Sequence, residues 1–278
     1  MTRTPPPPDG FHAGVPFAEY LAWDAINAST LKHARRSAAH AKEEIDRPSE
    51  SSSAMDFGIA THAAILEPDR YAAEMIVRPE WNRRTNAGKE AEAAFYAEHD
   101  GRIIVSQDEA DRIERVRAAV KDSALARKLS GTKGQREVSM VWRQSGLACK
   151  GRIDKLIDLG DVYGIVDLKT TRDASEDFFP RDAKARGYHR AGSWYADGIK
   201  ALTGKEARVF IIAVESEAPH GACAYEISCE ALEVGRREFV VAYQRLSEAM
   251  KSGVWGNYDG NILRTIEPTP WEMKRVGM

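Results

Sequence analysis

The sequence is poor in several features that mark particular classes of protein. Its three cysteines, Cys149, Cys223 and Cys229, are too few and too scattered for a disulfide framework or a cysteine-ligated cluster. This usage fits a reducing cytoplasm. No apolar run approaches the roughly 18–20 residues that a membrane helix needs, so we expect no membrane partner.

An excess of charge of one sign is absent as well. The chain has 40 Lys and Arg against 42 Asp and Glu, so a net charge of −2 neither indicates nor excludes a nucleic-acid partner. A hydrophobic content of 43% and a length of 278 residues suit a soluble globular protein with one large domain or two small ones. The Pro-rich start lacks the apolar segment of a signal peptide, and we expect residues 1–15 to form a disordered tail.

A helix rich in small residues is predicted over residues 55–66, where Glu67-Pro68 ends it. His62 lies four residues after Gly58 and therefore on the same helix face. The small residues around it indicate close packing against another element. A lone histidine in a helix is nevertheless more often a structural residue than a metal ligand.

A basic group is predicted downstream of this helix. Arg83, Arg84 and Lys89 lie close together in the sequence and would suit contacts with phosphate groups. A solvated surface accounts for such a group at least as well. We expect the surrounding stretch, about residues 71–134, to be a helical insertion.

The second half of the chain alternates between strand and helix patterns. In chain order it predicts three strands, a helix, two further strands and a last helix, over residues 137–142, 148–159, 162–170, 185–202, 208–214, 222–227 and 228–252. A mixed sheet with helices on its faces is an α/β (α+β) core. We expect one domain over residues 16–255 and an irregular tail over residues 256–278.

Two of these strands are predicted to form a hairpin that brings two aspartates together. Gly160-Asp161 reads as a two-residue turn, which pairs Leu159 with Val162. Counting back from the turn places Asp154 directly opposite Asp167. Residues opposed in this way lie roughly 4.5–5.5 Å apart at Cβ, and like charges there are destabilising. A divalent cation held by both carboxylates would supply the missing positive charge.

Alternation along the two strands predicts what each face carries. One face would be a core surface made of Ile153, Ile157, Leu159, Val162, Val166 and Leu168. The opposite face would carry Arg152, Asp154, Leu156, Ile165, Asp167 and Lys169. An exposed strand pair, in which Lys169 and Arg152 neutralise the aspartates, explains the spacing alone equally well.

These residues resemble the signature of a known nuclease superfamily. Asp154 followed by Asp167-Leu168-Lys169 after a hairpin turn resembles the Asp…(Asp/Glu)-x-Lys motif of the PD-(D/E)XK nucleases, whose restriction-endonuclease-like core also has the order αβββαβ. The His62 helix with Leu66-Glu67-Pro68 is similar to the histidine motif of the RecB-like branch, and residues 26–32 are similar to its N-terminal helix motif. The likeness is greatest to RecE-type exodeoxyribonucleases (exonuclease VIII).

The resemblance implies a role for each matching residue. His62, Asp154, Asp167 and the Leu168 backbone carbonyl would hold one or two Mg²⁺ or Mn²⁺ ions. Lys169 would orient or activate the attacking water in a metal-assisted hydrolysis of phosphodiester bonds. An oxygen-rich donor set with one imidazole suits these ions better than Zn²⁺. No iron–sulfur cluster is expected, because the cysteine set found in some RecB-like nucleases is missing.

Further residues are expected around the ligands. Glu137 also recurs in relatives and is expected beside the ligands or on the DNA side. The branch usually carries a glutamine four residues before Tyr195, but Ala191 stands there in this chain. Two outcomes stay open: contacts from Tyr188, His189 and Arg190 substitute for it, or the positioning of substrate is weakened.

RecE-type relatives degrade linear duplex DNA from its ends, form rings and hand a 3′ single strand to an annealing protein. The resemblance therefore implies a DNA exonuclease acting in phage-type or recombinational DNA processing, with a RecT-like annealing partner and a homo-oligomeric ring. Three alternatives stay open: a RecB-like nuclease that prefers single strands, a non-catalytic DNA-binding or assembly module with a decayed site, and a plain globular protein whose hairpin is a solvated salt-bridge surface.

Overall fold

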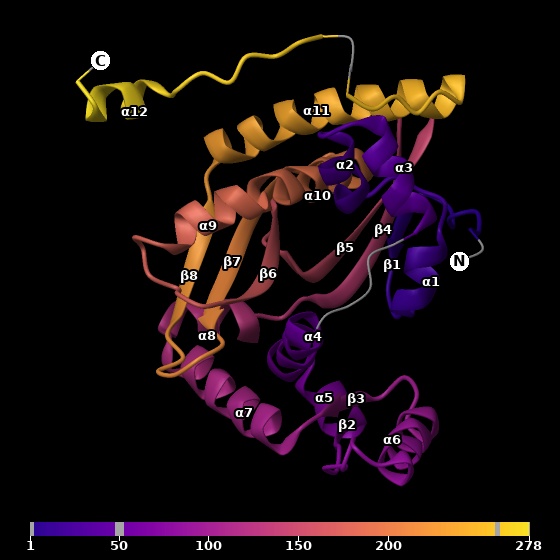
Figure 1. Ribbon diagram of the computed structural model, residues 1–278, viewed down its shortest axis with the longest axis vertical. Helices are drawn as coiled ribbons and strands as arrows, with labels where there is room; N and C mark the ends of the chain where they lie inside the picture. Colours follow the sequence, from indigo (N-terminus) through magenta and orange to yellow (C-terminus); the bar gives the residue numbers. More distant parts are fainter. Residues whose placement is uncertain (1–2, 48–52, 259–261, 278) are drawn as a thin grey trace.

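A six-stranded mixed sheet forms the centre of the molecule (Figure 1). The structure, a computed structural model, describes residues 3–47, 53–258 and 262–277. The strands lie in the order β1-β4-β5-β6-β7-β8; β6 and β7 run parallel and the other neighbours run antiparallel. Their bounds are β1 Gly10–His12, β4 Gln135–Gln144, β5 Leu147–Asp158, β6 Tyr163–Thr171, β7 Ala207–Glu215 and β8 Ala222–Ile227.

Helices cover both faces of this sheet, so the predicted α/β class is confirmed (Figure 1). One face packs against α2 (Ala28–Ala34), α3 (Ala38–Asp46), α10 (Tyr188–Thr203) and α11 (Cys229–Ser252), around Trp194 and Phe239. The other face packs against α4 (Ser53–Leu66), α7 (Gln107–Asp122) and α8 (Ala124–Gly131). Among the described residues, no helix combines the length and the apolar character that crossing a membrane requires.

The core follows the predicted order of elements with two differences. The helix expected over residues 185–202 is two helices, α9 (Phe179–Arg186) and α10, because Gly187 between them takes a left-handed conformation with φ +82°. The insertion is not purely helical. Besides helices it contains the strands β2 and β3, which pair in parallel. The bounds of these elements are α5 Pro68–Glu74, β2 Met75–Val77, α6 Asn86–Glu98 and β3 Ile103–Val105.

Both ends of the chain are more ordered than their composition predicts. The expectation of a disordered tail is wrong for Gly10–His12, which forms β1 and pairs antiparallel with β4. Met1 and Thr2 lie outside the described residues. The expectation of an irregular C-terminal tail is wrong for α12 (Pro270–Arg275), whose Thr269 and Glu272 form a reciprocal capping box.

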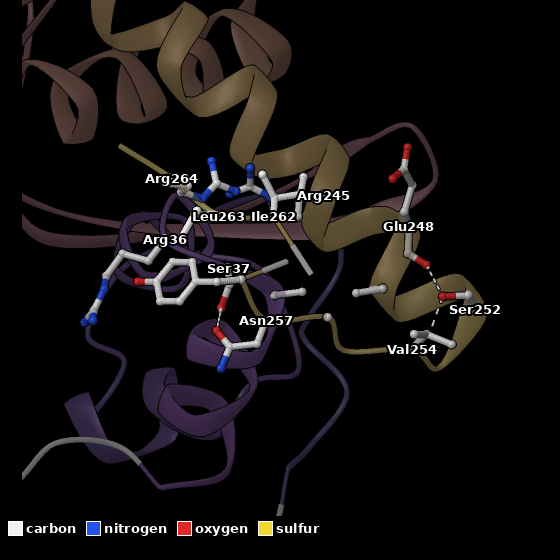
Figure 2. A pocket seen from close by; sticks show the side chains of 14 residues that line it. Arg36, Ser37, Arg245, Glu248, Ser252, Val254, Asn257, Ile262, Leu263 and Arg264 are labelled. Atoms are coloured by element: carbon white, nitrogen blue, oxygen red, sulfur yellow. Dashed lines mark hydrogen bonds between the residues drawn. The ribbon is translucent and has the colours of Figure 1, made fainter. Parts of the chain in front are cut away.

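After α11 the chain turns back over the N-terminal helices. Ala39 donates its backbone N–H to Gly256, and the Ser37 hydroxyl donates to Asn257 Oδ1 at 3.2 Å. Figure 2 shows the open cavity that this segment lines together with residues of α3 and α11. The segment beyond it leads away from the sheet towards α12 (Figure 1).

A buried lysine ties the short helix α1 (Phe17–Ala22) to the sheet. Lys150 of β5 is 3% exposed, and its ammonium donates to the carbonyls of Tyr20 at 2.8 Å, Leu21 at 3.1 Å and Trp23 at 2.7 Å. A helix of six residues is not stable alone, and its last carbonyls lack partners within the helix. One cation at its C-terminal end satisfies them and complements the helix dipole.

We expect Lys150→Met to destabilise the protein by about 2–4 kcal/mol, because the replacement leaves buried carbonyls without donors. Urea unfolding of both proteins measures the difference in the free energy of unfolding. Lys200→Met, at an exposed position on α10, is the matched control and should change stability by no more than about 0.5 kcal/mol. Equal stability of the two variants would contradict a structural role for the Lys150 ammonium.

The same lysine predicts a pH dependence. Burial, with a smaller contribution from Arg3, lowers the pKa of Lys150 from 10.5 to about 8. Between about pH 8 and pH 10.5 the unfolded chain therefore binds a proton that the folded chain has released, and stability rises with pH. The stability difference between wild type and Lys150→Met should widen over this window by at most roughly 1.4 kcal/mol per pH unit. A constant difference would contradict the shift.

Candidate active site

The two aspartates of the predicted hairpin meet where β5 and β6 separate. Gly160 makes the turn with φ +89°, and the pairing runs in the expected register back to Lys155 opposite Val166. The ladder stops there, one residue before the register would oppose Asp154 and Asp167. The backbone N–H of Leu168 instead donates to Asp154 Oδ2 at 3.0 Å. A carboxylate thus takes the hydrogen bond that a strand partner would otherwise accept.

The alternation of side chains along β5 changes at the same point. Ile153 packs with Leu156 and Ile165 in the cluster below α10, although residues three apart on a regular strand face opposite ways. The predicted core face is therefore wrong for Ile153, while Val166 and Leu168 do share a cluster on the α4 side. The neighbouring strand β4 is irregular at the same level.

Glu137 of β4 has φ +49°, a left-handed conformation that is uncommon for a residue other than glycine. The paired residues on either side of it would place it opposite Asp154, but it is missing from the ladder. A strained backbone of this kind persists only where its surroundings hold it, and such strain clusters at functional sites. Here it turns the Glu137 carboxylate towards α4.

His62 of α4 joins these two acids. Its Nε2 lies 2.7 Å from Asp154 Oδ2, and its Nδ1 lies 3.2 Å from Glu137 Oε1. The buried side of α4, which includes Phe57 and Ala64, packs against the insertion around Ile113 of α7. This packing fixes the helix, so the imidazole is held between two carboxylates that come from different strands.

Lys169 completes the cluster from β6. Its ammonium lies 2.6 Å from Asp167 Oδ2, and it stands 5.3 Å from the centre of the Tyr188 ring at the start of α10. The side chains of His62, Asp154, Asp167 and Lys169 are 18%, 20%, 20% and 29% exposed. The cluster is thus largely withdrawn from water but still open to a ligand.

The electrostatics of the cluster follow from this partial burial. Burial raises the pKa of Asp167 to about 6, with the neighbouring Asp154 adding to the effect against Lys169. For His62, burial disfavours the charged ring, but Asp154 and Glu137 outweigh it and raise the pKa to about 9. Burial likewise opposes a charge on Lys169, but Asp167 and Asp154 raise its pKa, so the ammonium stays protonated.

Tyr195 of α10 lies against β5 close to the acids. A Cβ on Gly151 would come within 3.0 Å of its ring, so the absence of a side chain at Gly151 allows the close approach. Burial, followed by the charges of Asp167 and Asp154, raises the pKa of the Tyr195 hydroxyl. The structure therefore brings Tyr188 and Tyr195 to the cluster, as expected from the sequence.

Four residues predicted to contact substrate are not brought to the cluster. Arg190 is buried and its guanidinium pairs with Glu238 of α11 at 2.9 Å, because α10 turns this side chain towards its neighbouring helix. Arg83 pairs with Glu92 within the insertion. Arg84 and Lys89 lie at the start of α6, which is at the outer end of the insertion (Figure 1). Local spacing could not show these placements.

Two residues near the cluster were missed as candidates from the sequence. Glu67 has a carboxylate oxygen within 4.8 Å of ligand atoms of His62 and Glu137, and these three could hold a metal ion. Arg152 donates through Nε to Glu137 Oε2 at 2.7 Å. The Leu66-Glu67-Pro68 motif pointed to Glu67, whereas the Arg152–Glu137 contact depends on the twist in β4 and had no local signal.

The fold and this cluster define a restriction-endonuclease-like protein of the PD-(D/E)XK type. Residues 27–265 match the family described as "PDDEXK-like domain of unknown function (DUF3799)", and the chain belongs to that family. No curated protein matches the sequence.

Solved structures align with the chain as well, among them the following two. A crystal structure from Eubacterium rectale, described as a "Putative exonuclease", aligns with a TM-score of 0.60 at 15% identity and covers 91% of this chain and 92% of that chain. At this identity the likeness shows the fold alone. The second, SSO0001, has a TM-score of 0.26 at 13% identity over 77% of this chain and 85% of that chain.

We expect Asp154→Asn to weaken Mn²⁺ binding at least tenfold, because a neutral amide replaces a carboxylate where the strands separate. Titration calorimetry with Mn²⁺ measures the affinity. Asp161→Asn, in the exposed turn of the same hairpin, is the matched control and should leave it unchanged. Glu67→Gln should have a smaller effect than Asp154→Asn, because Arg70 already pairs with Glu67 at 3.0 Å. Equal affinity in all three variants would contradict a metal site at Asp154.

Proposed function

We propose that the chain is a metal-dependent deoxyribonuclease that hydrolyses the phosphodiester bonds of linear double-stranded DNA from an end. The observation that carries the proposal is the meeting of Asp154, Asp167, Lys169 and His62 at the point where β5 and β6 separate. Membership of the PD-(D/E)XK-like family and the fold shared with the Eubacterium rectale structure support it.

The donor set fits a hard divalent cation. Glu137 and Glu67 already have arginine partners, Arg152 and Arg70. Among the described residues, the cationic partners of Asp154 and Asp167 are His62 and Lys169. Burial, to which the neighbouring Asp154 adds, raises the pKa of Asp167. Carboxylate oxygens with one imidazole suit Mg²⁺ or Mn²⁺.

Asp154, Asp167, His62 and the Leu168 carbonyl would hold the cation, as the superfamily motif implies. A cation held there would lower the pKa of a water and offset the charge that develops on the phosphate. His62 could serve as a ligand only after losing the proton that Asp154 and Glu137 now stabilise, so a cation and that proton compete for one position.

Lys169 acts as a cation in this proposal. Asp167 and Asp154 raise the pKa of its ammonium and so favour the protonated form. The ammonium orients the attacking water and faces the negative charge of the phosphate, while Asp167 holds it in place at 2.6 Å. Tyr188 and Tyr195 border the same space and position the substrate.

We expect wild type to release label from end-labelled linear duplex DNA only when Mg²⁺ or Mn²⁺ is present. Asp167→Ala should lower the rate at least about a hundredfold, because it removes a carboxylate that the cation requires. Asp161→Asn serves as the folded control with unchanged rate. The proposal fails if wild type releases no label under any divalent cation. Activity of Asp167→Ala equal to wild type would point to a solvated salt-bridge surface.

The form of DNA that is degraded tests the finer part of the proposal. We expect linear duplex to be consumed and covalently closed circular duplex to survive, because an exonuclease needs an end. Preferential loss of single strands would favour the RecB-like alternative. DNA binding without Mn²⁺ binding would favour a non-catalytic module with a decayed site, for which Ala191 in place of glutamine is the supporting observation.

The resemblance to RecE-type enzymes extends the proposal to assembly and to the cellular process. It implies a homo-oligomeric ring, a RecT-like annealing protein as partner, and a cytoplasmic role in phage-type or recombinational DNA processing. Analytical ultracentrifugation of the chain with and without DNA tests the ring. A sedimenting species of monomer mass in both conditions would contradict it.

A further inference from the structure

Phe17 is an exposed aromatic side chain next to the carboxylate cluster. It lies on α1, and 56% of it is exposed. Single exposed apolar side chains are common and need no explanation by themselves. What distinguishes Phe17 is the rigidity of its support and the identity of the groups beneath it.

The ring of Phe17 rests on a fixed base. It stacks on Tyr20, with ring centres 6.2 Å apart and planes inclined by 21°. The guanidinium of Arg152 lies 5.7 Å from the Phe17 ring and 5.9 Å from the Tyr20 ring. Arg152 is itself held by hydrogen bonds to Glu137 at 2.7 Å and to the Val15 carbonyl at 2.9 Å.

This base is continuous with the proposed active site. Arg152 and Asp154 are two residues apart on β5, a separation of roughly 6.6 Å along a strand. Glu137 lies 2.7 Å from Arg152 and 3.2 Å from His62. Two side chains, Arg152 and Glu137, therefore connect the exposed ring of Phe17 to the imidazole of the cluster.

Other exposed aromatic side chains lack this connection. Within the described ranges they are Tyr96 on α6 and Tyr258 and Trp271 in the C-terminal segment. The ring of Tyr96 contacts Trp81 and Phe95, that of Tyr258 contacts His40, and that of Trp271 contacts Arg275. None of these partners belongs to the cluster, so within the described ranges Phe17 is the exposed ring that side-chain contacts link to the site.

We propose that Phe17 stacks on a nucleobase of the bound strand next to the phosphate that is cut. The inference rests on the proposed function and adds a specificity-determining residue to it. Stacking on an aromatic ring tolerates any base, because every base presents a π face. A base can reach the ring only when it is unstacked from its own neighbours, which costs least at the end of a strand. Phe17 thus favours DNA whose terminal base is unpaired.

A binding cycle tests the proposal. Fluorescence anisotropy gives the Kd of short DNA with one unpaired end, in an Asp167→Asn background that keeps the DNA intact. Phe17→Ala should raise the Kd by roughly five- to 150-fold, the range for loss of one stacked base. Phe17→Trp should stay within about threefold of the Phe17 protein, because an indole ring stacks at least as well.

A series of DNAs, each with one abasic nucleotide at a different distance from the end, locates the stacked base. At that position the abasic DNA should weaken binding to the Phe17 protein but cause no further loss with Phe17→Ala, since both changes remove one interaction. Tyr96→Ala, an exposed aromatic on α6, should leave the Kd unchanged.

Two results would overturn the inference. One is an equal Kd for Phe17→Ala and Tyr96→Ala, and the other is abasic effects that are the same with and without Phe17. If wild type still degrades DNA in either case, the stacking role fails while the nuclease proposal stands. If wild type neither binds nor degrades DNA, the proposed function fails and the stacking role fails with it.

Discussion

Asp154 and Asp167 repel each other, and the backbone and side chains around them reduce that repulsion. The ladder between β5 and β6 stops one residue before they would face each other, and the Leu168 N–H turns to the Asp154 carboxylate. Burial disfavours the charged form of Asp167 and, with a smaller contribution from Asp154, raises its pKa to about 6. Two carboxylates placed together in a partly buried site favour the binding of a cation.

The charges around this pair fall into two groups with different uses. Glu137 and Glu67 are also paired with arginines, so less of their charge is left to attract a cation. His62 and Lys169 face the aspartates, and their own pKa values are raised in return. The first group fixes geometry. In the second group, Lys169 supplies the ammonium of the proposed chemistry, and His62 can become a ligand once it loses its proton.

One face of β5 connects these features along a single line. Lys150 anchors α1 by its last carbonyls, Arg152 supports the aromatic pair on α1, and Asp154 reaches the imidazole of α4. The three residues follow one another in steps of two, which is the period of a strand. The helix that carries Phe17 is therefore held in place by the same strand that presents Asp154.

Part of this arrangement is determined by the sequence alone. The Gly160 turn and the alternating pattern fixed the hairpin register, because a two-residue turn leaves a single pairing that buries the apolar residues. The helix that carries His62 and the order of elements in the core could likewise be predicted from local sequence patterns. Recognition of the superfamily followed from these same short spacings, and the match over residues 27–265 agrees with it.

Tertiary structure decided the rest, because it depended on contacts between distant segments. The left-handed backbone of Glu137 lies where the faces of β5 change, and Ile153 belongs to the cluster below α10, which no alternation pattern could show. Gly10–His12 became a strand through pairing with β4, against its Pro-rich context. Arg190 pairs with Glu238 because α11 packs beside α10. The position of Phe17 depends on Lys150, a buried lysine that holds α1 on the sheet.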